Sequence, residues 1–239
     1  MNKSSLKNFP LHGWVGLSFI IIFWYLNWEL NGLRTHILFF PLWLGYTLTI
    51  DAIVFLRKGK SLLTRNKKKF ILLFFISAPA WWLFEILNLR TQNWYYDGKQ
   101  FFTDVEYAVY ATLSFSTVIP SVFVTAELMS SFKIAEKFKF KSGFILKDWI
   151  TISIFIAGLI MLALLIIFPE YFFVFMWMSL LFLLDPINFY LKNPSLIKFV
   201  STGNWKPVIS LTIGCLLCGF FWELWNYYSY PKWVYDVPF

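Results

Sequence analysis

Long apolar runs separated by short polar segments make up most of the chain. The clearest run, Trp149 to Phe168, has 20 residues and no charged side chain. A helix of that length rises about 30 Å, which matches the hydrocarbon core of a bilayer. This pattern predicts an all-α membrane protein, a polytopic bundle of about seven transmembrane helices. The other runs are Leu11 to Trp28, Ile37 to Leu56, Phe70 to Leu87, Val105 to Met129, Tyr171 to Leu191 and Pro207 to Asn226.

The first run has a shorter apolar part than the others, Val15 to Leu26. It follows Lys3 and Lys7, as the apolar part of a signal peptide would, but no small-residue cleavage pattern follows Tyr25. We therefore predict an uncleaved first helix. Because its apolar part is short, a position in the membrane interface stays open for this helix.

Composition and charge agree with a membrane protein. Hydrophobic residues make up 59% of the chain and charged residues 14%, which leaves too little polar surface for a soluble domain. The formal charge is +8, but the basic residues lie between the apolar runs. With a cytoplasmic amino terminus and an extracytoplasmic carboxyl terminus, all but four of the 21 Lys and Arg are cytoplasmic, as the positive-inside rule requires. The charge then needs no nucleic-acid partner, although the basic loops would also attract anionic lipid headgroups.

Part of the first half of the chain recurs in the second half. Glu85 and Asn88 recur 138 residues later as Glu223 and Asn226. We interpret this as two parallel repeats, with residues 1–130 carrying four helices and residues 131–239 carrying three. The eighth helix expected of the second repeat is either lost, part of a longer product or supplied by a partner chain. The matches displaced by 134 residues are Trp43, Asp51, Ile53, Phe55, Ser61 and Leu62 with Trp177, Asp185, Ile187, Phe189, Ser195 and Leu196.

Two repeated carboxylates are the strongest candidates for chemistry. Glu85 and Glu223 each lie about 24 Å along a predicted helix from its cytoplasmic end, at the outer boundary of the hydrocarbon. An ionisable group at membrane depth needs a partner, water or neutralisation, and anchoring at a helix end is the plainer explanation. In each repeat an Asn follows three residues later on the same helical face, and aromatic residues surround the pair. The predicted site comprises Glu85 and Glu223 as catalytic residues and Asn88, Asn226, Trp82 and Trp222 as binding residues.

Asp51 and Asp185 form a second repeated pair near the cytoplasmic ends of their predicted helices. We assign them to an inner polar layer of the binding site, although pairing with loop cations would also explain them. The chain has only two histidines, and Cys215 and Cys218 lie inside an apolar run. The sequence therefore predicts no metal site and identifies no cofactor.

The end of the chain resembles a bacterial family of multi-pass membrane proteins whose activity is uncharacterised. The resemblance rests on the Trp-Glu-x-Trp-Asn pattern of residues 222–226 and the Pro-Lys-Trp of residues 231–233. It implies a bacterial cytoplasmic (inner) membrane and adds no function. The Trp-Tyr-Tyr-Asp loop of residues 94–97, followed by an acidic helix start, is also similar to the membrane lycopene cyclase domains. The Pro-Leu-Glu-Glu motif of those domains corresponds here to Asp104-Val105-Glu106, without the proline or the adjacent acidic pair.

Three functions fit these observations, and the sequence leaves open whether the protein is an enzyme. In the first, the outward-side carboxylates and aromatic residues bind an isoprenoid, another membrane lipid or a lipophilic small molecule and perform acid-base chemistry on it. In the second, the two acidic layers belong to a cation- or proton-coupled transporter. In the third, the protein is an assembly subunit that is completed by a partner membrane subunit or in a homo-oligomer.

Overall fold

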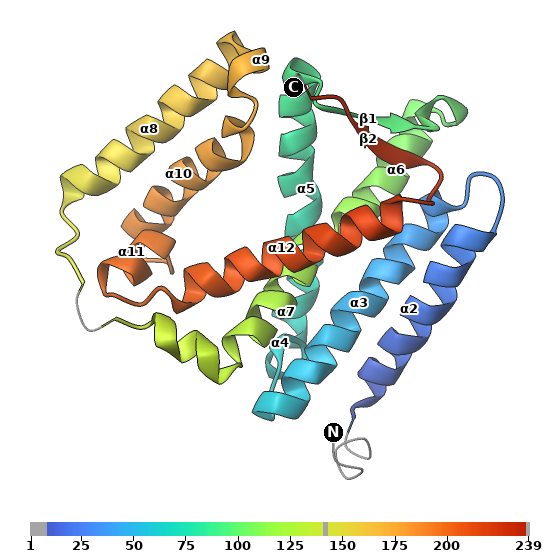
Figure 1. The fold of residues 1–239 in the computed structure, drawn as a ribbon, viewed down its shortest axis with the longest axis horizontal. Helices are drawn as coiled ribbons and strands as arrows, with labels where there is room; N and C mark the ends of the chain where they lie inside the picture. The colour runs from blue at the N-terminus through green and yellow to red at the C-terminus, as the bar shows by residue number, and fades with distance from the viewer. Residues whose placement is uncertain (1–8, 141–142, 238–239) are drawn as a thin grey trace. The chain divides into compact units, whose positions relative to one another are not determined.

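The computed structural model describes residues 9–140 and 143–237, and most of them are helical (Figure 1). Lys3, Lys7 and both chain ends lie outside the described residues, so the sides of the termini stay predictions. Two short strands, β1 (Trp94–Asp97) and β2 (Lys232–Tyr235), form a two-stranded sheet. The helices are α2 (Leu11–Glu29), α3 (Thr35–Lys58), α4 (Leu62–Arg65), α5 (Lys67–Thr91), α6 (Asp104–Phe115), α7 (Val118–Ser130), α8 (Asp148–Ile167), α9 (Pro169–Phe172), α10 (Phe175–Tyr190), α11 (Leu196–Ser201) and α12 (Lys206–Asn226), with 3₁₀ turns at Lys99–Phe101 and Lys133–Phe138.

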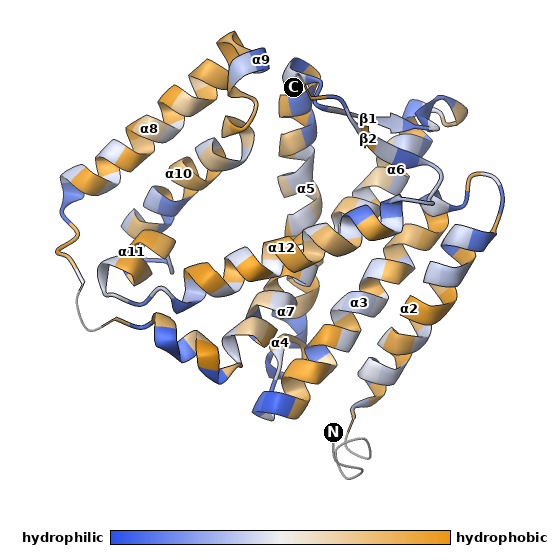
Figure 2. Ribbon diagram, viewed as in Figure 1, coloured by the Kyte–Doolittle hydropathy of each residue, from blue (hydrophilic) through white to orange (hydrophobic). Residues whose placement is uncertain are grey.

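Within the described residues, six helical segments are long and apolar enough to cross a membrane, as expected for a multi-pass membrane protein. Hydrophobic residues follow these segments, and the most hydrophilic residues lie mainly at helix ends and in the connections (Figure 2). The boundaries agree closely with the sequence pattern: the predicted run Ile37 to Leu56 lies inside α3. The six segments are Leu11–Glu29, Thr35–Lys58, Lys67–Thr91, Asp104–Ser130, Asp148–Ile167 and Lys206–Asn226.

The predicted run Tyr171 to Leu191 is divided in the structure. Helix α9 ends at Phe172 and α10 begins at Phe175, so α10 has only 16 residues. It rises about 24 Å, which is less than the thickness of a bilayer core. The two residues between α9 and α10 keep right-handed helical backbone angles, so the chain remains helical through the junction.

The fourth predicted helix is one span made of two pieces, α6 and α7, which meet at residues 116–117. Pro120 lacks an N–H and weakens the helix at this point. The hydroxyl of Ser77, on α5, donates to the Phe115 carbonyl oxygen at 2.5 Å and accepts from the Ile119 N–H at 3.0 Å. Those two backbone groups would bond to each other in a continuous helix, so Ser77 is inserted into the helical hydrogen-bond ladder.

The chain forms two compact units that interleave along the sequence. Unit 1 contains the residues up to Leu83, Tyr95–Phe132 and Ser210–Val234. Unit 2 contains Phe84–Trp94, Lys133–Ile209 and the residues from Tyr235 onward. Helices α5 and α12 therefore contribute to both units. This division differs from the predicted repeats, 1–130 and 131–239, which stay a prediction.

In unit 1, helices α2 and α3 lie side by side (Figure 1). Glycines stand where the two helices approach each other. A Cβ atom on Gly16 would lie 2.6 Å from Thr49 Oγ1 and 2.7 Å from the Gly45 carbonyl oxygen. A Cβ atom on Gly45 would lie 2.7 Å from Phe19 Cβ. These positions therefore accept only glycine, and small residues serve the same purpose at other contacts between membrane helices.

The core of unit 1 is aromatic and joins α3 to α12. The Trp43 side chain is fully buried, and its ring packs edge-on against that of Trp225 with 4.8 Å between centroids. The Tyr46 ring also contacts Trp43, at 5.1 Å. Rings in such edge-to-face arrangements contribute about 0.5–1.5 kcal/mol per pair beyond the area that they bury.

Buried hydroxyl groups join α3 to α7 in the same unit. Thr47 Oγ1 lies 2.9 Å from Ser121 Oγ, and the Tyr46 hydroxyl lies 2.9 Å from Thr125 Oγ1. Cys218 Sγ, on α12, is 3.6 Å from Thr125 Oγ1. Such contacts between neutral polar groups hold helices together where lipid provides no hydrophobic driving force.

Unit 2 is built around the α8 and α10 pair. A Cβ atom on Gly158 of α8 would lie 3.1 Å from the Leu183 backbone nitrogen, so these helices also approach closely. The last part of α5 belongs to this unit: the rings of Phe84 and Trp177 pack with 4.5 Å between centroids. Arg90 Nε donates to the Ile166 carbonyl oxygen at 2.8 Å, near the end of α8.

Glu136, in the 3₁₀ turn Lys133–Phe138, pairs with Lys139 at 2.6 Å and with Lys206 at the start of α12. These hydrogen bonds lower the pKa of Glu136 from 4.5 to about 2, and the hydrogen bond from Lys139 has the largest effect. Because folding lowers this pKa, the stabilisation is complete above about pH 4.5 and is lost as the pH falls toward 2.

We expect Glu136→Gln to lower the melting temperature of the purified protein slightly at pH 7 and far less at pH 2. An equal loss at both pH values would contradict this assignment.

Candidate functional site

Glu85 and Asn88 hold the segment that follows α5. Glu85 Oε1 accepts a hydrogen bond from the indole Nε1–H of Trp94 at 3.1 Å. Asn88 Nδ2 donates to the Trp94 carbonyl oxygen at 2.7 Å, and Asn88 Oδ1 accepts from the N–H groups of Asn93 and Trp94 at 2.8 and 3.3 Å. We call this arrangement the Glu-Asn clasp. It fixes the chain as it turns from the helix end into β1.

Glu223 and Asn226 form a second Glu-Asn clasp at the end of α12. The Trp233 Nε1–H donates to Glu223 Oε1 at 3.3 Å. Asn226 Nδ2 donates to the Trp233 carbonyl oxygen at 2.8 Å, and its Oδ1 accepts from the Trp233 N–H at 3.1 Å. The same three hydrogen bonds therefore occur at the end of α5, where β1 follows, and at the end of α12, where β2 follows.

The clasps give both predicted catalytic glutamates a structural role. Each carboxylate accepts an indole N–H, and each neighbouring amide binds backbone groups of the segment that follows the helix. A catalytic role for Glu85 and Glu223, and a ligand-binding role for Asn88 and Asn226, stay predictions.

Asp51 and Asp185 bind the backbones of the short helices α4 and α11. Asp51 accepts from the Ser61 hydroxyl at 2.6 Å and from the Leu63 N–H at 3.1 Å, and His12 Nε2 lies 3.3 Å from the same carboxylate. Asp185 accepts from the first two N–H groups of α11 at 2.6 and 2.9 Å. A carboxylate at a helix start satisfies free N–H groups and interacts favourably with the helix dipole. Both aspartates thus act as helix caps, and their predicted role in binding stays a prediction.

The two predicted tryptophans of unit 1 have different surroundings. Trp222 packs against Trp43 in the aromatic core, with 4.9 Å between ring centroids. Trp82 donates its Nε1–H to Thr112 Oγ1 on α6 at 2.9 Å. Trp82 therefore contacts α6.

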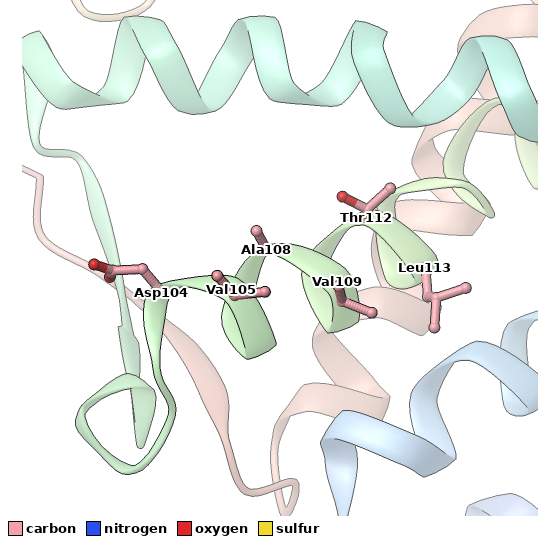
Figure 3. A pocket seen from close by; sticks show the side chains of 6 residues that line it. All are labelled: Asp104, Val105, Ala108, Val109, Thr112 and Leu113. Carbon is pink, nitrogen blue, oxygen red and sulfur yellow. The ribbon is translucent and has the colours of Figure 1, made fainter.

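A shallow, open groove of about 510 Å³ runs along α6 in unit 1, and all of its lining residues belong to this helix. Ala108 and Thr112 project from one side of this helix, whereas Val109 and Leu113 project from the other (Figure 3). Val109 is 52% exposed, so this face is open. We call this feature the α6 groove; its lining residues are Asp104, Val105, Ala108, Val109, Thr112 and Leu113.

Polar groups gather at one end of the α6 groove. Thr103 caps the helix through a reciprocal pair of hydrogen bonds: its Oγ1 accepts from the Glu106 N–H at 3.3 Å, and Glu106 Oε2 accepts from the Thr103 N–H at 2.9 Å. Lys99 Nζ lies 4.5 Å from the centre of the Tyr107 ring, in a cation–π contact. Asp104, the first helical residue, is exposed. The groove is therefore mainly apolar along the helix and has a carboxylate at one end.

Sequence reasoning did not find the α6 groove. The apolar residues of the fourth predicted helix are typical of any lipid-facing helix. Ala108 and Thr112 were the available signal, because two smaller residues four positions apart leave space on one helical face. That spacing is common, so it does not mark a groove by itself.

Comparison of the chain with models of known protein families, with curated proteins and with solved structures finds no match. In the described part of the chain, no group of three or more His, Cys, Asp or Glu side chains is placed to hold a metal ion. The function therefore has to be inferred from the chemistry of the molecule itself.

Proposed function

We propose that the protein is a multi-pass membrane protein that binds an elongated apolar lipid in the α6 groove. The lipid carries an isoprenoid or acyl chain, and its polar end lies at Asp104. The observation that carries this proposal is the groove itself, about 510 Å³ in volume and apolar except for Asp104 and Thr112.

The position of the groove supports a lipid rather than a water-soluble ligand. The α6 and α7 span is one of the helical segments that are long and apolar enough to cross a membrane. From Asp104 to Leu113 the groove follows the helix for about 14 Å, nearly half of the hydrocarbon core. A groove at that depth meets lipid chains rather than water, so an extended apolar chain is its natural occupant.

The charge at the end of the groove limits the polar group of the lipid. A carboxylate at Asp104 accepts hydrogen bonds, so it fits a hydroxyl or an ammonium group and repels a phosphate. We therefore infer a lipid alcohol or a lipid amine. Trp82, through its hydrogen bond to Thr112, fixes one of the two polar side chains in the lining.

Acid-base chemistry on the bound lipid is the enzymatic form of this proposal. In it, Asp104 acts as the acid or base because it is the carboxyl group in the groove lining. Glu85 and Glu223 then keep the loops in place through the Glu-Asn clasps. This assignment moves the reactive carboxyl from the two predicted glutamates to Asp104.

A transporter is the second candidate, and the break between α6 and α7 favours it. Discontinuous helices in transporters form substrate sites near the bilayer midplane, and residues 116–117 lie midway along the Asp104–Ser130 span. Each hydroxyl at this break already has a hydrogen-bond partner: that of Ser77 donates to Phe115, and that of Ser116 donates to Leu113. The lipid proposal is therefore preferred, because the α6 groove is open, whereas the hydroxyl groups at the break already have hydrogen-bond partners.

We further propose seven membrane spans arranged as two parallel repeats of four and three helices. Support for a seventh span comes from the helical backbone that joins α9 to α10. Support for the repeats comes from the two Glu-Asn clasps, which share three hydrogen bonds, and from the two aspartate caps. Orientation in a bacterial inner membrane, with a cytoplasmic amino terminus, rests on the distribution of Lys and Arg. A partner subunit or a homo-oligomer stays a prediction.

Filling the α6 groove tests the proposed function. Ala108→Trp places a large ring in the lining, and we expect it to reduce lipid binding about tenfold, which corresponds to about 1.4 kcal/mol. The full chain in nanodiscs would be labelled with two photoactivatable probes, an isoprenoid alcohol and a long-chain fatty alcohol. Labelling of the α6 peptide would be quantified by mass spectrometry, and the stronger of the two signals identifies the type of chain.

Ala163→Trp on α8 provides the matched control, because Ala163 is also a small residue on a membrane-length helix and is exposed. We expect this variant to be labelled on α6 like the unaltered protein. If both variants lose labelling equally, or if neither does, the α6 groove is not the lipid site.

A further inference from the structure

Seven basic residues lie between positions 57 and 69 of unit 1, in a segment whose backbone is fixed. Gly59 ends α3 with a φ of 70°, a left-handed conformation that glycine adopts without strain. Ser61 caps α4 and forms a capping box with Thr64, and the Asp51 carboxylate binds the start of the same helix. We call residues 57–69 the basic segment. Its charges are held on an ordered turn rather than on a flexible tail.

The end of α7 orients part of the basic segment. Both Nη atoms of Arg65 bind the Glu127 carboxylate, at 2.5 and 2.9 Å, and Lys58 Nζ lies 3.2 Å from the same group. Arg57 Nε donates to Ser131 Oγ at 2.6 Å. One carboxylate therefore neutralises only a small part of the positive charge.

The remaining lysines of the basic segment face outward. Lys60 and residues 67–69 are exposed, and among the described residues no carboxylate lies within ion-pair distance of their ammonium groups. Residues 67–69 form the first turn of α5. Directly after them, α5 exposes the apolar side chains of Ile71, Leu72 and Phe75. These lysines therefore lie where the apolar surface of a membrane-length helix begins, which is the depth of lipid headgroups.

We infer that the basic segment binds the phosphate groups of anionic phospholipids. An ordered cluster of ammonium groups at headgroup depth attracts anionic lipid and is screened by salt. The inference does not depend on the α6 groove, because it concerns a different lipid group and different residues.

Competition between neutral and anionic lipid tests this inference. The full chain would be placed in phosphatidylcholine nanodiscs containing a minor fraction of phosphatidylglycerol, and the retained lipids would be counted by native mass spectrometry. We expect phosphatidylglycerol to be enriched around the protein and the enrichment to fall as NaCl is raised. The triple variant K67Q/K68Q/K69Q should lower the enrichment by about tenfold or more.

The matched control removes three exposed lysines from other connections, as K133Q/K137Q/K198Q. It changes the net charge by the same amount, and we expect it to retain most of the enrichment. Unchanged melting temperatures in both triple variants would establish that neither is misfolded. Equal losses in the two variants would overturn the inference, because overall charge would then explain the enrichment, and so would full enrichment in K67Q/K68Q/K69Q. Labelling of the α6 groove by neutral lipid alcohols should be the same in both variants.

Discussion

Asn226→Leu is expected to lower the free energy of unfolding by roughly 2–4 kcal/mol. Leucine keeps the approximate size of the side chain, but it can neither donate to the Trp233 carbonyl oxygen nor accept from the Trp233 N–H. Each lost hydrogen bond costs about 1 kcal/mol, and the partly buried backbone groups that are left without this partner add to the loss. For a chain of this size, the melting temperature should fall by about 5–15 °C. Thermal unfolding in detergent, followed by tryptophan fluorescence, measures the change.

Two further variants show whether this loss belongs to the Glu-Asn clasp. Asn88→Leu removes the corresponding hydrogen bonds to Trp94 and should destabilise the protein by a similar amount. Asn31→Leu, at an exposed position between α2 and α3, should change the melting temperature by no more than about 2 °C. The structural role of the clasp would be refuted if all three variants unfolded at the temperature of the unaltered protein.

Much of the helical architecture could be predicted from the sequence because a lipid solvent imposes a simple rule. Every backbone polar group in the hydrocarbon must be bonded within its own helix, so apolar runs and helices coincide. The run Ile37 to Leu56 and helix α3 illustrate this agreement. The rule does not predict interruptions. Residues 116–117 and Pro120 lie within an apolar run, and the group that bridges the break is Ser77, about forty residues away in the sequence.

The candidate site shows a different limit of sequence reasoning. The sequence repeat singles out Glu85 and Glu223, and acidic residues at membrane depth need a partner. The partners are indole N–H groups nine and ten residues further along the chain, beyond a turn that the pattern of apolar residues does not describe. Asp104 is not among the site residues predicted from the sequence. Its position at the end of an apolar groove depends on the open face of α6, which hydropathy cannot reveal.

Trp43→Ala should be the most destabilising single substitution considered, at about 3–5 kcal/mol. The Trp43 side chain is fully buried in unit 1 and contacts the rings of Trp225 and Trp222 at 4.8 and 4.9 Å. Its removal leaves a cavity whose walls lose their packing contacts, and lipid cannot enter to replace them. The loss would be measured by unfolding in mixed detergent micelles at increasing fractions of dodecyl sulfate.

Trp177→Ala provides the matched control, because Trp177 is the counterpart of Trp43 displaced by 134 residues. The Trp177 side chain is 49% exposed, and its ring packs against Phe84 at 4.5 Å. Lipid or detergent chains can fill much of the space that this substitution creates, so we expect less than half of the loss caused by Trp43→Ala. Equal losses would contradict the different burial of the two residues. A clear difference would mean that two residues matched by the sequence repeat contribute unequally to the free energy of unfolding. The repeat alone would then not identify the residues that stabilise the protein most.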